Sequence, residues 1–460
     1  MGEGGLAQAQ QRMLDGGVHQ RAIDVFSHYY GQLESGTTGM ISEADIDPLG
    51  DVSHASELVV GLEEQREAAA VTAIIKLNGG LGTSMGMDRA KSLLTVRPEL
   101  TFLDVIVGQV QSVRRELGVP LPLIFMNSFR TRDDTLAALA KYPDLVVDGL
   151  PLDFLQNREP KLHSDDLSPV DWPADPSLEW CPPGHGDLYT ALEVSGVLDS
   201  LIVRGFRYAS VSNSDNLGAS PDPAMMGWFA ASGAPYAAEV CRRTLADVKG
   251  GCLVVRRTDG RLVLRETAQT SPDDLDAAGD LSRHRYFHTN NLWFDLVALR
   301  TALEERNGVL GLPLIRNTKT VDPTDASSPE VIQMETAMGA VIEVFDGAQA
   351  IEVDRSRFLP VKTTNDLLVL RSDVYDVGTD FTVRAQVEKP PWVDLDARYF
   401  KTIAGFDARI PSTPSMIDAR SLTVVGDWNF GADVIVRGDV RLEDAGAPAS
   451  VATSSILGPG

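Results

Sequence analysis

The sequence predicts an α/β fold, in which a doubly wound parallel sheet is followed by a smaller β-rich domain. Strand-like apolar runs alternate with helical patterns, which is typical of a parallel sheet covered by helices on both faces. These runs are 71–77, 121–127 and 206–212. Short β runs separated by glycines, between 422 and 442, indicate a few turns of a β-solenoid. We therefore expect a helical N-terminal segment (1–70), a central α/β domain (71–375) and a C-terminal β domain (376–460).

The N-terminal segment is predicted to be helical. Apolar side chains between residues 11 and 33 recur at roughly helical spacing, and Gly36 and Gly39 interrupt the pattern. We interpret this segment as a brace on the central domain.

A capping box marks the helix that joins the first two strands. Thr101 is followed three residues later by Asp104, in place of the more usual Glu, and a helical apolar pattern continues to Val113. In doubly wound sheets, ligands bind beyond the carboxyl ends of the strands. The glycine-rich loop 76–86 follows the first strand and the polar segment 212–216 follows a later one, so we expect both to face one cleft.

Three further strands are expected in the second half of the central domain. The runs 236–241, 252–256 and 261–266 are typical of antiparallel strands joined by turns, with a hairpin signal at 258–260. We expect them to form a subdomain over the acceptor part of the cleft.

The composition excludes several classes of protein. The formal net charge of −24 argues against binding to nucleic acid or to an anionic membrane, since both require a basic surface. No apolar run is long enough to span a bilayer. The three cysteines, Cys181, Cys241 and Cys252, fit neither a disulfide framework nor a zinc site, so we expect a cytoplasmic protein.

The loop 76–86 is the strongest candidate for a ligand site. It places four glycines in eight positions directly after an apolar run, and glycine lets backbone N–H groups approach a ligand closely. A Walker A loop requires a different glycine–lysine spacing, and Gly80, Gly82 and Gly86 do not match the Rossmann spacing. A nucleotide site of a third kind and a tight structural turn both remain open from spacing alone.

Four other segments carry groups suited to binding. His185 lies between two glycines in a loop fixed by two prolines, and Asp215 ends a strand, where it suits Mg²⁺ or an Asx turn. The amides at 290–291 suit a hydroxyl-rich ligand, and the cations of 355–362 form either an anion site or a solvated face.

Taken together, these segments resemble the UTP–glucose-1-phosphate uridylyltransferases, or UDP-glucose pyrophosphorylases, of the eukaryotic type. The resemblance runs from about residue 20 to the β-rich C-terminus. The motifs that carry it lie at 76–86, 91–92, 182–187, 211–218, 248–251, 289–293, 331–340 and 355–364. It implies a Rossmann-like nucleotidyltransferase core, with a mixed sheet similar to the GT-A fold, followed by a left-handed β-helix.

The resemblance also implies roles for individual residues. The nucleotide would be held by Leu77, Asn78, Gly79, Gly80, Gln156, Gly184 and Asn213, although the residues that flank Gln156 differ from the family pattern. The sugar phosphate would be held by His185, Gly251, Glu266 and Asn290. Lys91 and Lys362 would contact phosphates as catalytic cations, and Asp215 would bind Mg²⁺.

The implied reaction joins glucose 1-phosphate to the α-phosphate of UTP and releases UDP-glucose and pyrophosphate. The attacking phosphate is already ionised, so catalysis needs positioning and charge stabilisation rather than a general base. Two alternatives remain: a uridylyltransferase for another sugar 1-phosphate, such as galactose or N-acetylglucosamine 1-phosphate, and a non-catalytic nucleotide-binding scaffold. Any homo-oligomer is expected to form through the C-terminal domain.

Overall fold

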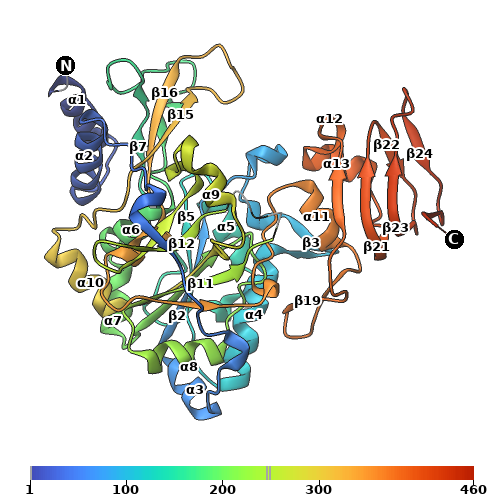
Figure 1. The fold of residues 1–460 in the computed structure, drawn as a ribbon, viewed down its shortest axis with the longest axis horizontal. Coiled ribbons are helices and arrows are strands. Elements are labelled where there is room, and N and C mark those ends of the chain that lie inside the picture. Colours follow the sequence, from blue (N-terminus) through green and yellow to red (C-terminus); the bar gives the residue numbers. More distant parts are fainter. Residues whose placement is uncertain (1–2, 245–246, 248–249, 460) are drawn as a thin grey trace.

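A seven-stranded mixed sheet forms the centre of the computed structural model, which describes residues 3–244, 247 and 250–459 (Figure 1). Its strand order is β17-β11-β14-β10-β2-β5-β6, and only β14 runs antiparallel to its neighbours. The strands are β2 (Thr72–Asn78), β5 (Leu123–Asn127), β6 (Asp153–Leu155), β10 (Tyr208–Asn213), β11 (Tyr236–Arg242), β14 (Tyr286–Asp295) and β17 (Gln349–Glu352).

Helices cover both faces of this sheet because its strands are apolar on both sides. Ile74 and Phe125 pack into one core layer, whereas Ile75 and Ile124 pack into the other. The first layer includes α3 (Leu62–Ala70), α4 (Phe102–Leu117) and α8 (Pro223–Ser232). The second includes α6 (Leu188–Val194), α7 (Val197–Val203) and α10 (Leu296–Glu305). This is the doubly wound arrangement that the alternation of strands and helices predicts.

The capping box at the start of α4 is confirmed. Thr101 Oγ1 accepts a hydrogen bond from Asp104 N at 3.2 Å, and Asp104 Oδ2 accepts one from Thr101 N at 2.9 Å. The three predicted strands also form, as β2, β5 and β10, with ends that differ by one or two residues.

The predicted grouping of three antiparallel strands is wrong in one member. β12 (Cys252–Arg256) and β13 (Leu262–Arg265) form the expected hairpin, but their third strand is β1 (Ile46–Pro48) from the N-terminal segment. β11 instead lies in the central sheet, between β14 and β17. Every β11 residue from Tyr236 to Cys241 is buried, which suits an internal strand covered on both faces.

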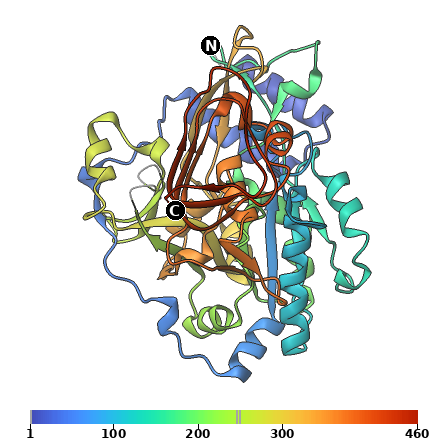
Figure 2. The same cartoon turned by 90° about the vertical axis from the view of Figure 1, so that its right-hand side faces the viewer.

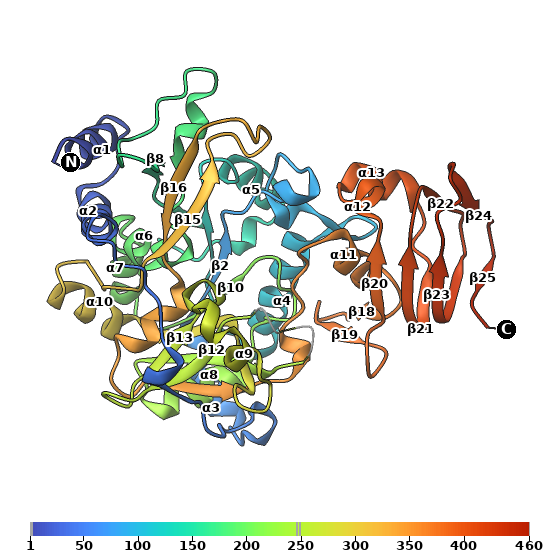
Figure 3. The same ribbon diagram turned by 45° about the horizontal axis from the view of Figure 1, so that its top comes forward.

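The N-terminal helices pack against the edge of the central domain. α1 (Glu3–Asp15) and α2 (Gln20–Glu34) bury an apolar cluster against a small antiparallel sheet, which explains their bracing position (Figure 3). That sheet consists of β8 (Leu162–His163), β15 (Ile315–Thr320) and β16 (Glu330–Glu335). In this cluster Phe26 and Tyr30 pack with Ile332 and Met334.

The C-terminal region consists of stacked parallel strands and lies to one side of the central sheet (Figures 1 and 2). One sheet contains β20 (Trp392–Leu395), β21 (Ser415–Val424), β23 (Ile435–Leu442) and β25 (Ile456–Leu457), and a second contains β22 (Trp428–Phe430) and β24 (Ala449–Val451). Val393, Leu422 and Val440 stack in register and are buried. The chain between the central domain and these sheets forms α11 (Thr364–Arg371), β18 (Tyr375–Val377) and β19 (Val383–Ala385). Two short helices, α12 (Ala397–Phe400) and α13 (Ile403–Arg409), lie between β20 and β21 in the sequence.

Within the described part of the chain, no helix is both long enough and apolar enough to cross a membrane.

Candidate active site

The carboxyl ends of β2 and β10 bring two predicted binding segments together. The two strands are parallel neighbours, and their pairing ends with Leu77 beside Asn213. Ser214 N donates to Leu77 O at 3.0 Å, just beyond that last pair. The glycine-rich loop and the segment that carries Asp215 therefore leave the same edge of the sheet side by side.

The glycine-rich loop is anchored by Asn78 and lies close to Gln156. The buried Asn78 side chain donates to Asn127 Oδ1 and Thr135 Oγ1, both at 2.9 Å, and accepts from Ser214 Oγ at 2.9 Å. A Cβ atom on Gly79 would lie only 2.5 Å from Gln156 Oε1, so a side chain at this position would displace the Gln156 amide.

Gly80 lies further along the loop and is exposed, with open space where a Cβ atom would be. Its carbonyl accepts a hydrogen bond from Lys91 N at 3.2 Å. This bond ties the loop to the segment that supplies a predicted catalytic cation.

Lys91 and Asp215 form an ion pair at this edge. Lys91 Nζ lies 2.7 Å from Asp215 Oδ2, and their side chains are 16% and 22% exposed. Val361 N donates to Asp215 O at 3.2 Å, which places the next residue, Lys362, beside the same strand end with an exposed side chain. The structure thus pairs one predicted catalytic cation, Lys91, with the predicted metal ligand, and places the backbone of the other, Lys362, next to it.

The loop 182–187 contacts the chain at Thr336 and Met338. Gly184 has a φ of 79°, and a Cβ atom there would lie 2.7 Å from Thr336 O, so glycine is required. His185 Nδ1 accepts a hydrogen bond from Met338 N at 2.9 Å, and burial lowers the pKa of its ring. We infer a neutral His185 with its proton on Nε2, where it can donate to a ligand.

Asp187 links this loop to the segment that carries Gln156. It accepts hydrogen bonds from Asn157 N at 2.5 Å and Asn157 Nδ2 at 2.8 Å, and burial raises the pKa of its carboxyl to about 7. The segments that carry Gly184 and Gln156, both predicted nucleotide contacts, are therefore joined by one buried carboxyl. No role for Asp187 was predicted from the sequence, although it lies within the motif 182–187.

Three of the four predicted sugar-phosphate residues, Gly251, Glu266 and Asn290, lie around β12, β13 and β14. A Cβ atom on Gly251 would lie 2.6 Å from Glu266 Oε2, so these two residues are in contact. Burial raises the pKa of Glu266, and the positive charge of Lys362 opposes that shift, so this carboxyl lies within the electrostatic reach of the lysine. Val248 and Lys249, the first residues of the motif 248–251, are outside the described residues.

Asn290 has a left-handed backbone within β14, with a φ of 60°. Its N–H donates to His288 Nδ1 at 3.1 Å, which supports this turn of the chain. In the described ranges, no hydrogen bond joins Asn290 or Glu266 directly to the glycine-rich loop. Lys362 relates the two sets, because its charge reaches Glu266 and its neighbour Val361 bonds to Asp215.

Lys76 begins the glycine-rich motif but lies in the core rather than in the site. Its fully buried Nζ donates to Ser212 Oγ and to Ala219 O, both at 2.7 Å. Burial lowers the pKa of Lys76 to about 7, and the nearby charge of Arg357 adds to the effect. The residue ties β2 to β10 beneath the strand ends.

A metal ion would have to rely on few protein ligands. No group of three or more His, Cys, Asp or Glu residues is arranged to hold a metal within the ranges that the structure describes. Asp215 nevertheless fits Mg²⁺, which is often bound by one or two carboxylates with phosphate oxygens and water completing its shell. Its Oδ2 is paired with Lys91, and its side chain is open enough to reach a ligand.

The fold and the site define a nucleotidyltransferase, with a glycine-rich loop and a lysine–carboxylate ion pair beside the ends of adjacent parallel strands. Residues 23–437 match the family model for UTP–glucose-1-phosphate uridylyltransferase. The chain belongs to this family.

Individual relatives agree with the family model. The chain is 41% identical over 371 residues to UTP–glucose-1-phosphate uridylyltransferase from Saccharomyces cerevisiae, covering 80% of this chain and 73% of the relative. The enzyme from Hordeum vulgare is 39% identical over 389 residues, covering 84% and 80%.

Solved structures agree in fold over almost the whole chain. UDP-glucose phosphorylase from Trypanosoma brucei has a TM-score of 0.90 and 41% identity, covering 99% of this chain and 98% of that one. A mutant of UDP-glucose pyrophosphorylase from Leishmania major, solved in complex with UDP-glucose, has a TM-score of 0.91 and 38% identity, covering 98% of each chain.

Proposed function

We propose that this protein forms UDP-glucose and pyrophosphate from UTP and glucose 1-phosphate. The observation that carries the proposal is the pairing of Lys91 with Asp215 beside the glycine-rich loop, with Lys362 attached to the same strand end. Membership of the uridylyltransferase family, and a relative solved with UDP-glucose, support the choice of substrates.

We assign the nucleotide to the side of the site formed by β2 and the loop 182–187. Leu77, Asn78, Gly79 and Gly80 would hold the uridine and its phosphates through the loop backbone. Gln156 and Gly184 would contact the uracil, and Asn213 the ribose. The close packing of Gly79 against Gln156 supports this assignment, since base recognition and the phosphate loop then form one surface.

We assign the sugar phosphate to the side formed by β12, β13 and β14. Gly251, Glu266 and Asn290 would line the glucose pocket, and His185 would donate its Nε2 proton to the sugar phosphate. The raised pKa of Glu266 supports a carboxyl that accepts hydrogen bonds from hydroxyl groups in a partly dry pocket.

The chemistry requires charge stabilisation rather than proton transfer. A phosphate oxygen of glucose 1-phosphate attacks the α-phosphorus of UTP in line with the leaving pyrophosphate. Lys91 and Lys362 would neutralise the negative charge that gathers there and hold the two phosphates in line. Mg²⁺, held by Asp215 and phosphate oxygens, would polarise the phosphates when bound.

Three further features belong to the proposal. The stacked C-terminal strands would form a left-handed β-helix that begins near residue 376, and this domain would mediate any homo-oligomer. The central catalytic domain would span 71–375, after a helical segment of 1–70. We place the enzyme in the cytoplasm, where UTP and sugar phosphates are available.

The test is pyrophosphate release from UTP by the purified protein, with and without Mg²⁺, across a panel of sugar 1-phosphates. We expect release with glucose 1-phosphate and its abolition by a metal chelator. Faster release with galactose or N-acetylglucosamine 1-phosphate would identify that sugar phosphate as the substrate instead. Nucleotide binding without any pyrophosphate release would indicate a non-catalytic scaffold instead of an enzyme.

A further inference from the structure

The segment 355–362 carries Lys362 but has little secondary structure of its own. After the short 3-10 turn Arg355–Arg357, it continues as irregular chain to Lys362. Its path must therefore be set by contacts with its neighbours rather than by a sheet or helix.

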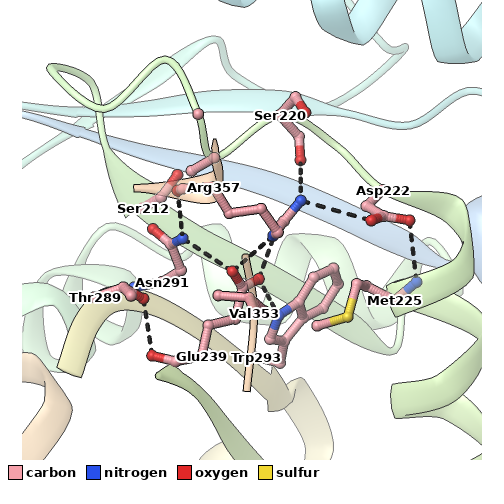
Figure 4. Close-up of polar contacts among 12 residues, drawn as sticks. Ser212, Ser220, Asp222, Met225, Glu239, Thr289, Asn291, Trp293, Val353 and Arg357 are labelled. Carbon is pink, nitrogen blue, oxygen red and sulfur yellow. Dashed lines mark hydrogen bonds and ion pairs between the residues drawn. The ribbon is translucent and has the colours of Figure 1, made fainter. Parts of the chain in front are cut away.

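A buried ion pair at Arg357 provides the first of these contacts (Figure 4). Arg357 Nε lies 2.8 Å from Glu239 Oε2, and Arg357 Nη2 lies 2.7 Å from Glu239 Oε1, so the two side chains meet as a two-pronged pair. Glu239 is fully buried in the middle of β11. Its two oxygens also accept hydrogen bonds from Asn291 Nδ2 and Trp293 Nε1, both at 3.0 Å.

The backbone beyond Arg357 is then fastened to the chain that follows β10. Arg357 O accepts from Asn216 Nδ2 at 3.1 Å, and Leu359 N donates to Asn216 Oδ1 at 2.8 Å. Asn216 and Pro360 form an isolated antiparallel bridge, after which Val361 N reaches Asp215 O. These contacts lead directly from the ion pair to the position of Lys362 beside Asp215.

The same carboxyl also lies at an irregularity in β14. The pairing of β11 with β14 shifts register between Ala238 and Val240, so Glu239 lies opposite the three residues 289–291. Thr289 Oγ1 donates to Glu239 O at 2.8 Å. This bulge contains Asn290 in its left-handed conformation, and bulges commonly redirect a side chain next to an active site.

We propose that Glu239 and Arg357 form a positioning pair, which places Lys362 against Asp215 and supports the bulge that presents Asn290. The Glu239 side chain is fully buried and that of Arg357 is 13% exposed, so both act through the residues that they place. The inference rests on the proposed function, because its readout is uridylyl transfer.

The first test is Arg357→Lys, which keeps the positive charge but loses the two-pronged geometry. We expect kcat to fall by about a hundredfold, the effect of roughly 1 Å of misplacement, while KM for UTP stays within about threefold. Arg242→Lys is the matched control. Arg242 lies on β11, as Glu239 does, and makes a similar two-pronged pair with Glu352 of β17, at 2.8 and 3.2 Å. It has no link to Lys362 in the described contacts. Its kcat should not change.

A second pair of variants separates positioning from folding. Removing one partner of a buried pair destabilises a protein, whereas replacing both is often neutral. The double variant Glu239→Gln/Arg357→Met removes both charges and leaves an amide oxygen for Trp293. We expect its melting temperature to stay within about 4 °C of wild type, while kcat falls by at least about tenfold.

A double-mutant cycle with Lys362→Ala tests the route of the effect. If Arg357 acts through Lys362, adding Arg357→Lys to Lys362→Ala should lower kcat by no more than about twofold further. An unchanged kcat in a folded Arg357→Lys variant, or the full hundredfold loss in the Lys362→Ala background, would overturn the positioning role alone. Absence of wild-type turnover would overturn the proposed function, and the positioning role with it.

Discussion

Replacing Lys91 by Met tests the central electrostatic argument for the site. The substitution removes one positive charge and keeps an unbranched apolar side chain of similar reach. Lys91 is 16% exposed and its partner Asp215 is 22% exposed, so water screens charges at this strand end only partly. Two unit charges about 4 Å apart interact by roughly 4 kcal/mol at an effective dielectric near 20. If the transition state loses an interaction of that size, kcat should fall by about a thousandfold.

The assay is the steady-state release of pyrophosphate from saturating UTP, glucose 1-phosphate and Mg²⁺. Lys141→Met is the matched control, because Lys141 Nζ also lies 2.7 Å from a carboxylate, that of Asp104. This carboxylate belongs to the first turn of α4 and not to the segments beyond β2 and β10. Asp104 keeps its hydrogen bonds to Thr101 and Tyr142 in that variant. We expect its kcat to equal that of wild type.

Two results would refute the reasoning about Lys91. One is a kcat for Lys91→Met within about tenfold of wild type, since that loss is well below the roughly 4 kcal/mol of the charge interaction. The other is recovery of wild-type turnover when Asp215→Asn is added, because Lys91 would then serve only to neutralise Asp215.

Two glycine substitutions and one carboxyl give further predictions. Gly79→Ala would push a Cβ atom to 2.5 Å from Gln156 Oε1, so it should raise KM for UTP by about tenfold or more and leave KM for glucose 1-phosphate nearly unchanged. Gly251→Ala would crowd Glu266 Oε2 at 2.6 Å and should have the opposite selectivity, so the same shift in both KM values in either variant would contradict the assignment. The pKa of Asp187 is about 7 in the folded protein, above the value of about 3.9 expected in the unfolded chain. The contribution of Asp187 to the free energy of unfolding is therefore full below about pH 4, and it falls by roughly 4 kcal/mol as the pH rises to 7. Asp187→Asn should remove that fall, and urea denaturation that gives parallel pH profiles for both proteins would contradict it.

The parts of the fold that follow local rules could be predicted from the sequence. The runs that became β2, β5 and β10 are apolar on both faces, and the capping box at Thr101 needs only four consecutive residues. The rule that ligands bind beyond the carboxyl ends of parallel strands then placed the glycine-rich loop and Asp215 together. Each of these inferences depends on a short stretch of chain and a general packing rule.

The parts that depend on distant partners could not be predicted. β11 and β12 have similar apolar composition, and only tertiary packing decides that the first joins the central sheet while the second pairs with β1. Glu239 shows no sequence signal, because an isolated acid in an apolar run gives no indication of the arginine, amide and indole that surround it. Such a residue is found only when its partner, 118 positions later, is placed beside it.

The direction of β14 gives the two sides of the proposed site different backbone structures. The parallel strands β2 and β10 end at the site, and the loops that follow them lie there. β14 runs antiparallel to β10 and passes the same edge of the sheet. Its pairing with β10 reaches Leu292 beside Val211, so Asn290 lies at the height where β10 ends, in the middle of a continuing strand. A regular strand offers no loop at that point, and the bulge opposite Glu239 supplies the irregular backbone instead. The Glu239 carboxyl accepts from Asn291 in the bulge and binds Arg357, so in the proposed reaction one buried carboxyl would support both the sugar side of the site and the chain that carries Lys362.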